Sequence, residues 1–450
     1  MLKDIRGGIR LMGWGIENVR EQRQVARDYH KLQDERLRTL IRHAYDNVDF
    51  YRQRYDEAGV RPEDIQSVDD IHKLPITTKD DIRLNFPILA KNIASQECQV
   101  FGTSGSTGSP LSIYRQDIPI AVPLPPGMIS KFIWPVIKQL GKVKLMTIFV
   151  TSDGAAENLV TQTFGSISGL STLSKVFIDA LDDPSDHLDA VRRFQPDVLI
   201  TYPSVLRNMA LLAKERGEVL SKPWLIVYSA EMMDAHAKRV VNEVFKAEFI
   251  EVYGSTEGEI MAIECFKHQG LHIQSGDAVV EVLKEGMPCP PGVPGQVAVT
   301  NLRNMACPII RYSGLGDIAV LSTKRCTCGS PLPLLERVEG RIANSLVLAD
   351  KRVVHPFKAT LALEHIPFMN KFQIIQESLS QVRVLVVADK HHHAQLASPF
   401  SAGQSSWITI VGNLSSLLGK GITITVEEVS EIPRPQGAPN HPVVLSLVGK

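Results

Sequence analysis

The chain lacks an excess of charge of either sign, a disulfide-rich composition and any long apolar run. Lysine plus arginine number 49, as do aspartate plus glutamate, so no overall field favours nucleic acid or an anionic membrane surface. Six cysteines in 450 residues do not resemble a secreted disulfide framework. No apolar stretch approaches the length that crosses a bilayer, and the N-terminus shows no signal-peptide core. We therefore expect a cytoplasmic protein with no nucleic-acid partner and no membrane span.

The chain does contain enough apolar residues, 44% of the total, for a sizeable core. Residues 16–57 carry apolar positions at helical spacing without a proline, which predicts helix. Further on, short apolar segments alternate with helical stretches, a pattern that favours an α/β domain with layered, largely parallel sheets. The expected strands of this region are Leu145–Val150, Val198–Tyr202, Leu225–Tyr228 and Phe249–Tyr253, and the expected helices are Pro203–Glu215 and Ala235–Val244.

The character of the chain changes near Arg341, which predicts two domains. We expect a large domain over residues 1–341 and a small α+β domain over residues 342–450. The order of elements in the second suits a ferredoxin-like βαββαβ domain. Later expected strands are Gln296–Leu302, Asp317–Leu321, Phe372–Ile375, Gln381–Ala388 and Ile422–Val426, with helices near Pro356–His365 and Gln404–Leu418.

Residues 103–110 read Thr-Ser-Gly-Ser-Thr-Gly-Ser-Pro and form the most informative motif. Glycines let the backbone approach a ligand closely, and hydroxyl and N–H groups can surround one anion. The apolar pair Val100 and Phe101 precedes the stretch, so we expect it to leave a strand. It lacks the Gly-Lys-Ser/Thr ending of a Walker A loop, and by composition alone it could be a flexible linker. The residues expected to bind phosphate are Thr103, Ser104, Gly105, Ser106, Thr107 and Gly108.

Later segments carry groups that suit the rest of a nucleotide. One reads Tyr-Gly-Ser-Thr-Glu directly after an expected strand, where α/β sheets place ligands. In it, Tyr253 offers a flat face to a base, Thr256 a hydroxyl, and Glu257 a hard oxygen ligand for Mg²⁺. Asp317 could accept from two ribose hydroxyls, and Arg341 would lie near a sugar or phosphate. The remaining candidates are Gly254 and Ser255 of the same motif, and Ser229, Ala230 and Glu231, which end another strand and could border a base.

The order and content of these motifs resemble the adenylate-forming superfamily of acyl-CoA synthetases, adenylation domains and luciferases, over nearly the whole chain. Residues 43–51 and 74–79 look like phenylacetate–CoA ligases and the related capsular-polysaccharide-biosynthesis proteins. Residues 201–204 and 353–357 look closer to the second group. The superfamily follows from five motifs in the family order, whereas none of them fixes the substrate.

The resemblance implies an ATP-dependent ligase that works in two steps. A carboxylate of a small or aromatic acid attacks the α-phosphate of ATP, which gives an acyl adenylate and pyrophosphate. Coenzyme A, a carrier thiol or an amine then displaces AMP. The loop would wrap the β- and γ-phosphates, Glu257 would hold Mg²⁺, and Tyr253, Asp317 and Arg341 would hold the nucleoside. The resemblance also implies that residues 1–341 bind ATP and substrate and that residues 342–450 form a mobile lid, because the small domain of this family rotates between the two steps. The motifs leave the oligomeric state open, a dimer included.

A structural zinc site is also expected. Cys326 and Cys328 form a tight pair on a turn, and Cys265 and His272 would complete a Cys₃His tetrahedron. Phenylacetate–CoA ligases show a similar pattern, and some carry zinc there. His268 is a rival ligand to His272, and the alternative for the whole set is buried free thiols. The other cysteines are expected to be packing residues: Cys98, Cys289 and Cys307.

The chain departs from the family pattern where a lysine is expected near the C-terminus. Ala438 stands at that position. Ala343 stands where the family usually has a hinge aspartate or lysine. Three explanations compete. Another cation could substitute, with Lys79, Arg434 and Lys450 as candidates; the substrate could be unusual, such as nitrite for N–N bond formation; or the protein could bind nucleotide with impaired adenylation. We take Glu257, Thr256 and Lys79 as the catalytic candidates.

Overall fold

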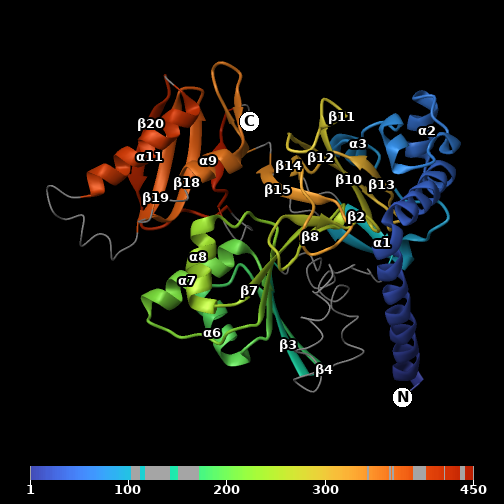
Figure 1. Ribbon diagram of the computed structural model, residues 1–450, viewed down its shortest axis with the longest axis horizontal. Helices are drawn as coiled ribbons and strands as arrows, with labels where there is room; N and C mark the ends of the chain where they lie inside the picture. Colours follow the sequence, from blue (N-terminus) through green and yellow to red (C-terminus); the bar gives the residue numbers. More distant parts are fainter. Residues whose placement is uncertain are drawn as a thin grey trace.

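Figure 1 shows a computed structural model of the chain, with the N-terminal helices on one side and a small sheet of C-terminal strands on the other. The structure describes residues 2–102, 112–116, 142–150, 172–341, 344–363, 366, 369–388, 402–419, 421–435 and 441–448. The predicted phosphate loop at residues 103–110, together with Ala343, Ala438 and Lys450, lies outside the described residues.

The N-terminal region is helical, as its spacing predicts. Helix α1 (Leu2–Asn47) is interrupted at Asp28, whose φ of −161° is not helical, and α2 (Asp49–Glu57) follows it directly. Apolar residues of both helices enter a core that also contains Tyr312. Short helical turns then lead to α3 and the first strand: η1 (Pro62–Asp64), η2 (Val68–Lys73), α3 (Lys79–Leu84) and η3 (Ser95–Glu97). No helix of the described residues is both long and apolar enough to cross a membrane.

A large mixed sheet forms the centre of the molecule, with 13 strands among the described residues in the order β11-β10-β12-β14-β15-β9-β8-β7-β6-β5-β3-β4 and β13 beside β12. Strands β3 (Lys142–Phe149), β4 (Thr172–Asp179), β5 (Val198–Thr201), β6 (Leu225–Ser229) and β7 (Glu248–Ser255) pair in parallel. From β7 onward the pairing is antiparallel. The expected α/β class is therefore confirmed, with the parallel arrangement confined to one half of the sheet.

The antiparallel half is built from β8 (Glu259–Glu264), β9 (Leu271–Ile273), β10 (Ala278–Lys284), β11 (Met287–Pro288), β12 (Pro294–Asn301), β13 (Ile309–Tyr312), β14 (Asp317–Leu321) and β15 (Leu334–Arg341). A separate hairpin of β1 (Cys98–Gly102) and β2 (Ser112–Gln116) pairs only with itself among the described strands. Strand β1 ends at Gly102, so the expectation that residues 103–110 leave a strand is confirmed.

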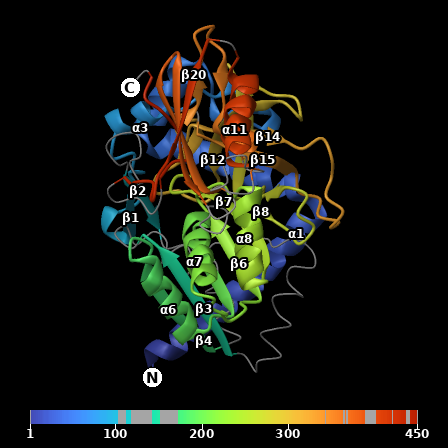
Figure 2. The same cartoon turned by 90° about the vertical axis from the view of Figure 1, so that its left-hand side faces the viewer.

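Three helices cover one face of the parallel strands, as Figure 2 shows: α6 (Pro184–Phe194), α7 (Pro203–Glu215) and α8 (Ala235–Phe245). Each begins with a clear signal. Proline occupies the first turn of α6 and α7, where its missing N–H costs nothing. The Asp234 side chain accepts the N–H of Ala237 at the start of α8. Their apolar faces share one core with Met146 and Ile148 of β3.

The C-terminal region forms a four-stranded sheet in the order β20-β19-β18-β21. It contains β16 (Leu346–Val347), β17 (Val353–Val354), α9 (Pro356–Leu363), β18 (Met369–Ser378), β19 (Gln381–Ala388), α11 (Ala402–Leu418), β20 (Thr423–Glu428) and β21 (Val444–Ser446). This order differs from βαββαβ: β16 and β17 pair with each other as two-residue strands. The edge of β18 is therefore left to β21, which pairs with it in parallel.

Candidate functional site

Tyr253, Asp317 and Arg341 lie together although 88 positions separate the first from the last in the numbering. The Tyr253 hydroxyl donates to Asp317 Oδ2 at 2.9 Å. Asp317, the first residue of β14, is paired in register with Arg341, the last residue of β15. Arg341 Nε lies 3.9 Å from Asp317 Oδ1. A phenol, a carboxylate and a guanidinium thus meet at one edge of the sheet.

Burial controls the charge state within this group. Burial raises the pKa of Asp317 above its usual range, although the Arg341 guanidinium and the Tyr253 hydroxyl act against that shift. Burial and the neighbouring Asp317 carboxyl raise the pKa of Tyr253 well above 10, so the phenol stays a neutral donor. Tyr253 engages only one of the two Asp317 oxygens. The carboxylate can therefore accept further hydrogen bonds in a largely buried place, where bonds to a charged group are strong.

Glu257 lies in the tight turn between β7 and β8. Its side chain is buried, and the Tyr312 hydroxyl donates to Oε1 at 3.2 Å. Asn301 Nδ2 donates to the Glu257 carbonyl at 3.2 Å. Glycine is required at position 254, because a Cβ there would lie 2.6 Å from the carbonyl oxygen of Glu259. The turn therefore presents a fixed carboxylate with free acceptor positions, which fits a hard cation such as Mg²⁺.

Lys79 begins α3 and belongs to the same neighbourhood. The segment directly before Lys79 is attached to the sheet, because Thr77 N donates to the carbonyl of Arg311 in β13 at 2.9 Å. Lys79 is half-buried, and burial lowers its pKa. Glu257 and Arg341 both act on its ammonium electrostatically. Among the described residues, no hydrogen bond or ion pair engages that ammonium, so its charge is available to a ligand.

The end of β6 holds three predicted site residues in different settings. Ser229 is in register with Val252, the neighbour of Tyr253, so it lies beside the site. Ala230 adopts a φ of +69° as the chain turns away. The Glu231 carboxylate, however, accepts the backbone N–H of Ser204 at 3.0 Å and its hydroxyl at 3.1 Å. Glu231 therefore stabilises the first turn of α7.

Within the motif, Ser255 holds the turn itself, since its hydroxyl accepts the Gly258 N–H at 2.9 Å. The Thr256 carbonyl accepts a hydrogen bond from the guanidinium of Arg115. The motifs pointed to neither Arg115 nor Tyr312 as a site residue. A signal for Arg115 exists in the sequence. It lies two residues after Ile113 on a strand just after the loop, so both side chains point to the same, inward face.

The four predicted zinc ligands come together, with all their ligand atoms within 4.8 Å of one another. Cys265 Sγ lies 3.5 Å from Cys326 Sγ, and His272 Nε2 lies 3.4 Å from Cys328 Sγ. The rival His268 is engaged elsewhere, because its Nδ1 lies 2.9 Å from Glu264 Oε1. Spacing in the sequence could not separate the two histidines, and the structure brings His272 to the cysteines.

The surroundings of this cluster suit a metal thiolate. Backbone N–H groups point at the sulfurs: Lys267 N lies 3.4 Å from Cys265 Sγ, and Cys328 N lies 3.5 Å from Cys326 Sγ. Such bonds stabilise negative sulfur, although burial is the larger influence and raises the pKa of the Cys265 thiol to about 12. Burial lowers the pKa of His272 to about 4, which keeps the imidazole neutral as a metal requires. Three sulfurs and one nitrogen in a largely buried, closed arrangement fit structural zinc.

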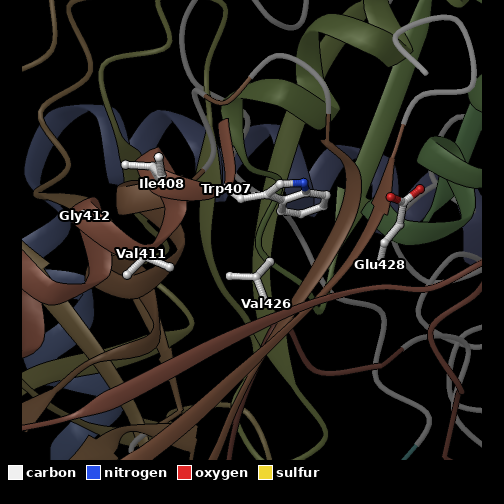
Figure 3. Close-up of a pocket in the computed structure, with 6 residues that line it drawn as sticks. All are labelled: Trp407, Ile408, Val411, Gly412, Val426 and Glu428. Carbon is white, nitrogen blue, oxygen red and sulfur yellow. The ribbon is translucent and has the colours of Figure 1, made fainter. Parts of the chain in front are cut away.

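A surface hollow lies apart from these groups, on the C-terminal sheet. Helix α11 and strand β20 line it, as Figure 3 shows, with Trp407, Ile408, Val411, Gly412, Val426 and Glu428. None of the predicted site residues belongs to it. Its walls are mainly apolar with a single carboxylate, which does not suit a polyphosphate.

Comparison with known proteins bears on the chemistry. Residues 163–307 match the family model described as AMP-binding enzyme. The chain is 27% identical over 348 residues to a phenylacetate-coenzyme A ligase of Thermus thermophilus, covering 75% of each. It is 25% identical over 430 residues to that of Escherichia coli, covering 90% of this chain and 92% of the other. A crystal structure of 2-hydroxyisobutyryl-CoA ligase in the postadenylation state shares its fold, with a TM-score of 0.73 at 18% identity over 92% of this chain and 89% of that one.

Proposed function

We propose that this chain, which belongs to the adenylate-forming superfamily, is an ATP-dependent, AMP-forming ligase. It activates a carboxylic acid for transfer to coenzyme A. The resemblance seen in the motifs is confirmed by the AMP-binding family match and by the similarity to phenylacetate–CoA ligases. The observation that carries the proposal is the meeting of Tyr253, Asp317 and Arg341 beside Glu257.

The nucleoside is assigned to the edge where β7, β14 and β15 meet. Tyr253 would border the base with its ring and hold Asp317 with its hydroxyl. The Asp317 carboxylate would accept from the ribose hydroxyls, and Arg341 would lie toward the sugar or the phosphate. Ser229 and Ala230 end the adjacent strand and would form the other wall of the base site.

The phosphates are assigned to residues 103–108, which join the two strands of the β1–β2 hairpin. Glu257 would hold Mg²⁺, and this cation would offset the charge on the departing pyrophosphate. Thr256 precedes Glu257 in the turn, so its hydroxyl would lie toward the same phosphates.

Lys79 is assigned the positive charge that adenylation needs between the acid and the α-phosphate. In that step a carboxylate oxygen forms a bond to the α-phosphorus while the bond to pyrophosphate breaks. A fixed ammonium near both groups stabilises the charge that develops there. The support for Lys79 is its half-buried ammonium, which no other described residue engages and which lies within the field of Glu257 and Arg341. This assignment would compensate for Ala438.

A small or aromatic acid is the proposed substrate, and coenzyme A the proposed acceptor. Support comes from the curated relatives, which are phenylacetate–CoA ligases. In the second step the thiol sulfur attacks the acyl carbon and AMP leaves with the bonding electrons. The comparisons give no support to a nitrite substrate or to a binding protein without turnover.

Two further assignments complete the proposal. Zinc would be held by Cys265, His272, Cys326 and Cys328 and would serve the fold. The chain would divide into residues 1–341 and 342–450, and the separate apolar core around Leu346, Ile374 and Leu414 supports this division.

The test is product formation by the full chain. Protein with Mg²⁺-ATP and coenzyme A would be incubated separately with phenylacetate, benzoate, acetate, 2-hydroxyisobutyrate and nitrite, and AMP and acyl-CoA would be measured by chromatography. We expect AMP and a matching thioester with at least one acid, and loss of both in Glu257→Gln. Absence of AMP with every acid, with or without coenzyme A, would refute the activity. AMP with nitrite alone would instead favour N–N bond chemistry.

A further inference from the structure

Arg115 has an unusual place for a charged side chain. It lies on β2 and is 8% exposed. The guanidinium carbon lies 4.7 Å from the centre of the Phe101 ring on β1, a cation–π contact within the hairpin. The hairpin strands are held in register, with Gly102 opposite Ser112. The chain between those two residues is the proposed phosphate loop, so the hairpin is the stem of that loop.

The polar atoms of Arg115 point away from the hairpin, toward the turn that carries Glu257. One terminal nitrogen donates to the Thr256 carbonyl, the peptide bond directly before Glu257. The Nε atom lies 3.5 Å from Glu259 Oε1, in an ion pair on the other side of Glu257. A single guanidinium thus engages the residues on both sides of the proposed magnesium ligand.

Side-chain contacts are what locate the hairpin, because among the described strands β1 and β2 share no ladder with the large sheet. Ile113 anchors it in the apolar core, and Asn304 Nδ2 donates to the Tyr114 carbonyl at 2.9 Å. Neither of these contacts reaches the β7–β8 turn. Arg115 therefore supplies a direct link between the stem of the loop and the turn.

We propose that Arg115 is a positioning residue that fixes the β1–β2 hairpin relative to the turn that presents Glu257. The inference rests on the proposed function, because it assigns the loop to phosphate and Glu257 to magnesium. It predicts a specific effect on ATP rather than a general effect on the enzyme.

The planar fork of arginine is the property that this role requires. One nitrogen reaches the carbonyl while another faces the carboxylate and the plane lies over Phe101. Lysine keeps the positive charge but offers a compact ammonium without that fork. Arg115→Lys therefore tests geometry at constant charge.

The experiment compares Arg115→Lys with a matched control, Arg36→Lys. Arg36 is also partly buried, donates to a backbone carbonyl, that of Gly276 at 2.6 Å, and pairs with a carboxylate, Asp277 at 3.2 Å. Those partners lie outside the β7–β8 turn. Calorimetric titration with Mg²⁺-ATP gives the Kd, acid titrations under turnover give KM and kcat, and thermal unfolding gives the Tm.

We expect Arg115→Lys to raise the Kd for Mg²⁺-ATP roughly tenfold, the size of one charge-assisted hydrogen bond, while the KM of the acid changes less than twofold. Arg36→Lys should lower the Tm comparably and leave the Kd for ATP unchanged. An unchanged Kd in Arg115→Lys would overturn this inference alone, as would equal losses in both variants. Failure of the wild-type protein to bind Mg²⁺-ATP would overturn the proposed function itself, and this inference with it.

Discussion

Replacing Asp317 by asparagine tests the nucleoside site most directly. Asparagine keeps the shape of the side chain but replaces two charged acceptor oxygens by one neutral acceptor and one donor. The Tyr253 hydroxyl, which donates to Oδ2 at 2.9 Å, can still find the remaining oxygen. The variant should therefore fold, and the loss should fall on the ligand that the carboxylate is proposed to bind.

The size of that loss follows from the surroundings of Asp317. Its contact with Arg341 is weak, because the 3.9 Å separation and the 45% exposed arginine side chain allow solvent to screen it. Hydrogen bonds to a charged group inside a protein contribute about 1.5–3 kcal/mol each. One such bond to a ribose hydroxyl predicts that Asp317→Asn raises the Kd of ATP roughly 10- to 100-fold.

The assay that isolates the contact pairs the variant with altered ligands. Binding of ATP, 2′-deoxyATP and 3′-deoxyATP would be titrated with wild-type protein and with Asp317→Asn. The wild type should discriminate against at least one deoxy analogue, and the variant should bind that analogue and ATP with similar affinity. Tyr253→Phe, which keeps the ring and deletes the hydroxyl, serves as the milder control. If the variant discriminates between ATP and the analogues as strongly as the wild type does, Asp317 does not hold the ribose.

Three further results are expected. Lys79→Ala should lower kcat for AMP formation roughly 10²–10³-fold while the Kd of ATP changes little. Partial recovery of kcat in Lys79→Arg would show that the positive charge is what matters. An unchanged kcat in Lys79→Ala would mean that Lys79 is not catalytic. Metal analysis of protein made without a histidine tag should find about one zinc per chain, lost in Cys328→Ser but kept in Cys98→Ser. A metal-free wild-type protein would mean that the four residues are a free histidine and free thiols. Burial and the neighbouring Glu264 raise the pKa of Glu251 from 4.5 to about 7, so the folded state holds its proton longer than the unfolded state does. The free energy of unfolding therefore falls as pH rises from 4.5 to 7, by up to about 3 kcal/mol. In urea unfolding, Glu251→Gln should be as stable as the wild type near pH 4.5 and more stable above pH 7. Parallel pH profiles of the two proteins would contradict the shift.

Local signals predicted the individual elements well. Helix α7 begins at Pro203 and ends at Glu215, as the sequence indicates, because a proline in the first turn and an apolar stripe are local properties. Strands β14 and β19 also have the expected ends. The motif residues were identifiable near strand ends: Asp317 begins β14, Arg341 ends β15, and Tyr253 lies two residues before the end of β7.

Pairing between distant segments could not be predicted in the same way. Strand β9 is three residues long and lies between β8 and β15, a position that no periodicity encodes. That pairing sets His272 opposite Leu334 and so decides between the two candidate histidines. Likewise, nothing local indicates that β21 rather than an earlier strand completes the C-terminal sheet. Arg115 belongs to the same class, since its partners lie 141 and 144 positions away.

The change from parallel to antiparallel pairing at β7 explains why the site forms where it does. Parallel strands β5, β6 and β7 end at one edge, and the antiparallel partner β8 requires a tight turn at that same edge, which presents Glu257. Strand β14 begins there with Asp317, and β15 returns there with Arg341. The cysteine cluster lies at the other ends of β8, β14 and β15. Cys265 follows the last residue of β8, and Cys326 lies in the connection from β14 to β15.

The candidate site and the cysteine cluster therefore lie at opposite ends of one set of strands. Strand β14 has five residues, so about 13 Å separate its first and last residues at the usual rise per residue. A metal at the far end would fix how β8 and the β14–β15 pair are aligned, and that alignment sets the separation between Glu257 and Asp317. Loss of the metal should then weaken ATP binding without any contact between the two, and it should do so more than it weakens acid binding. Equal losses for both ligands would instead mean that the cluster supports only the general stability of the domain.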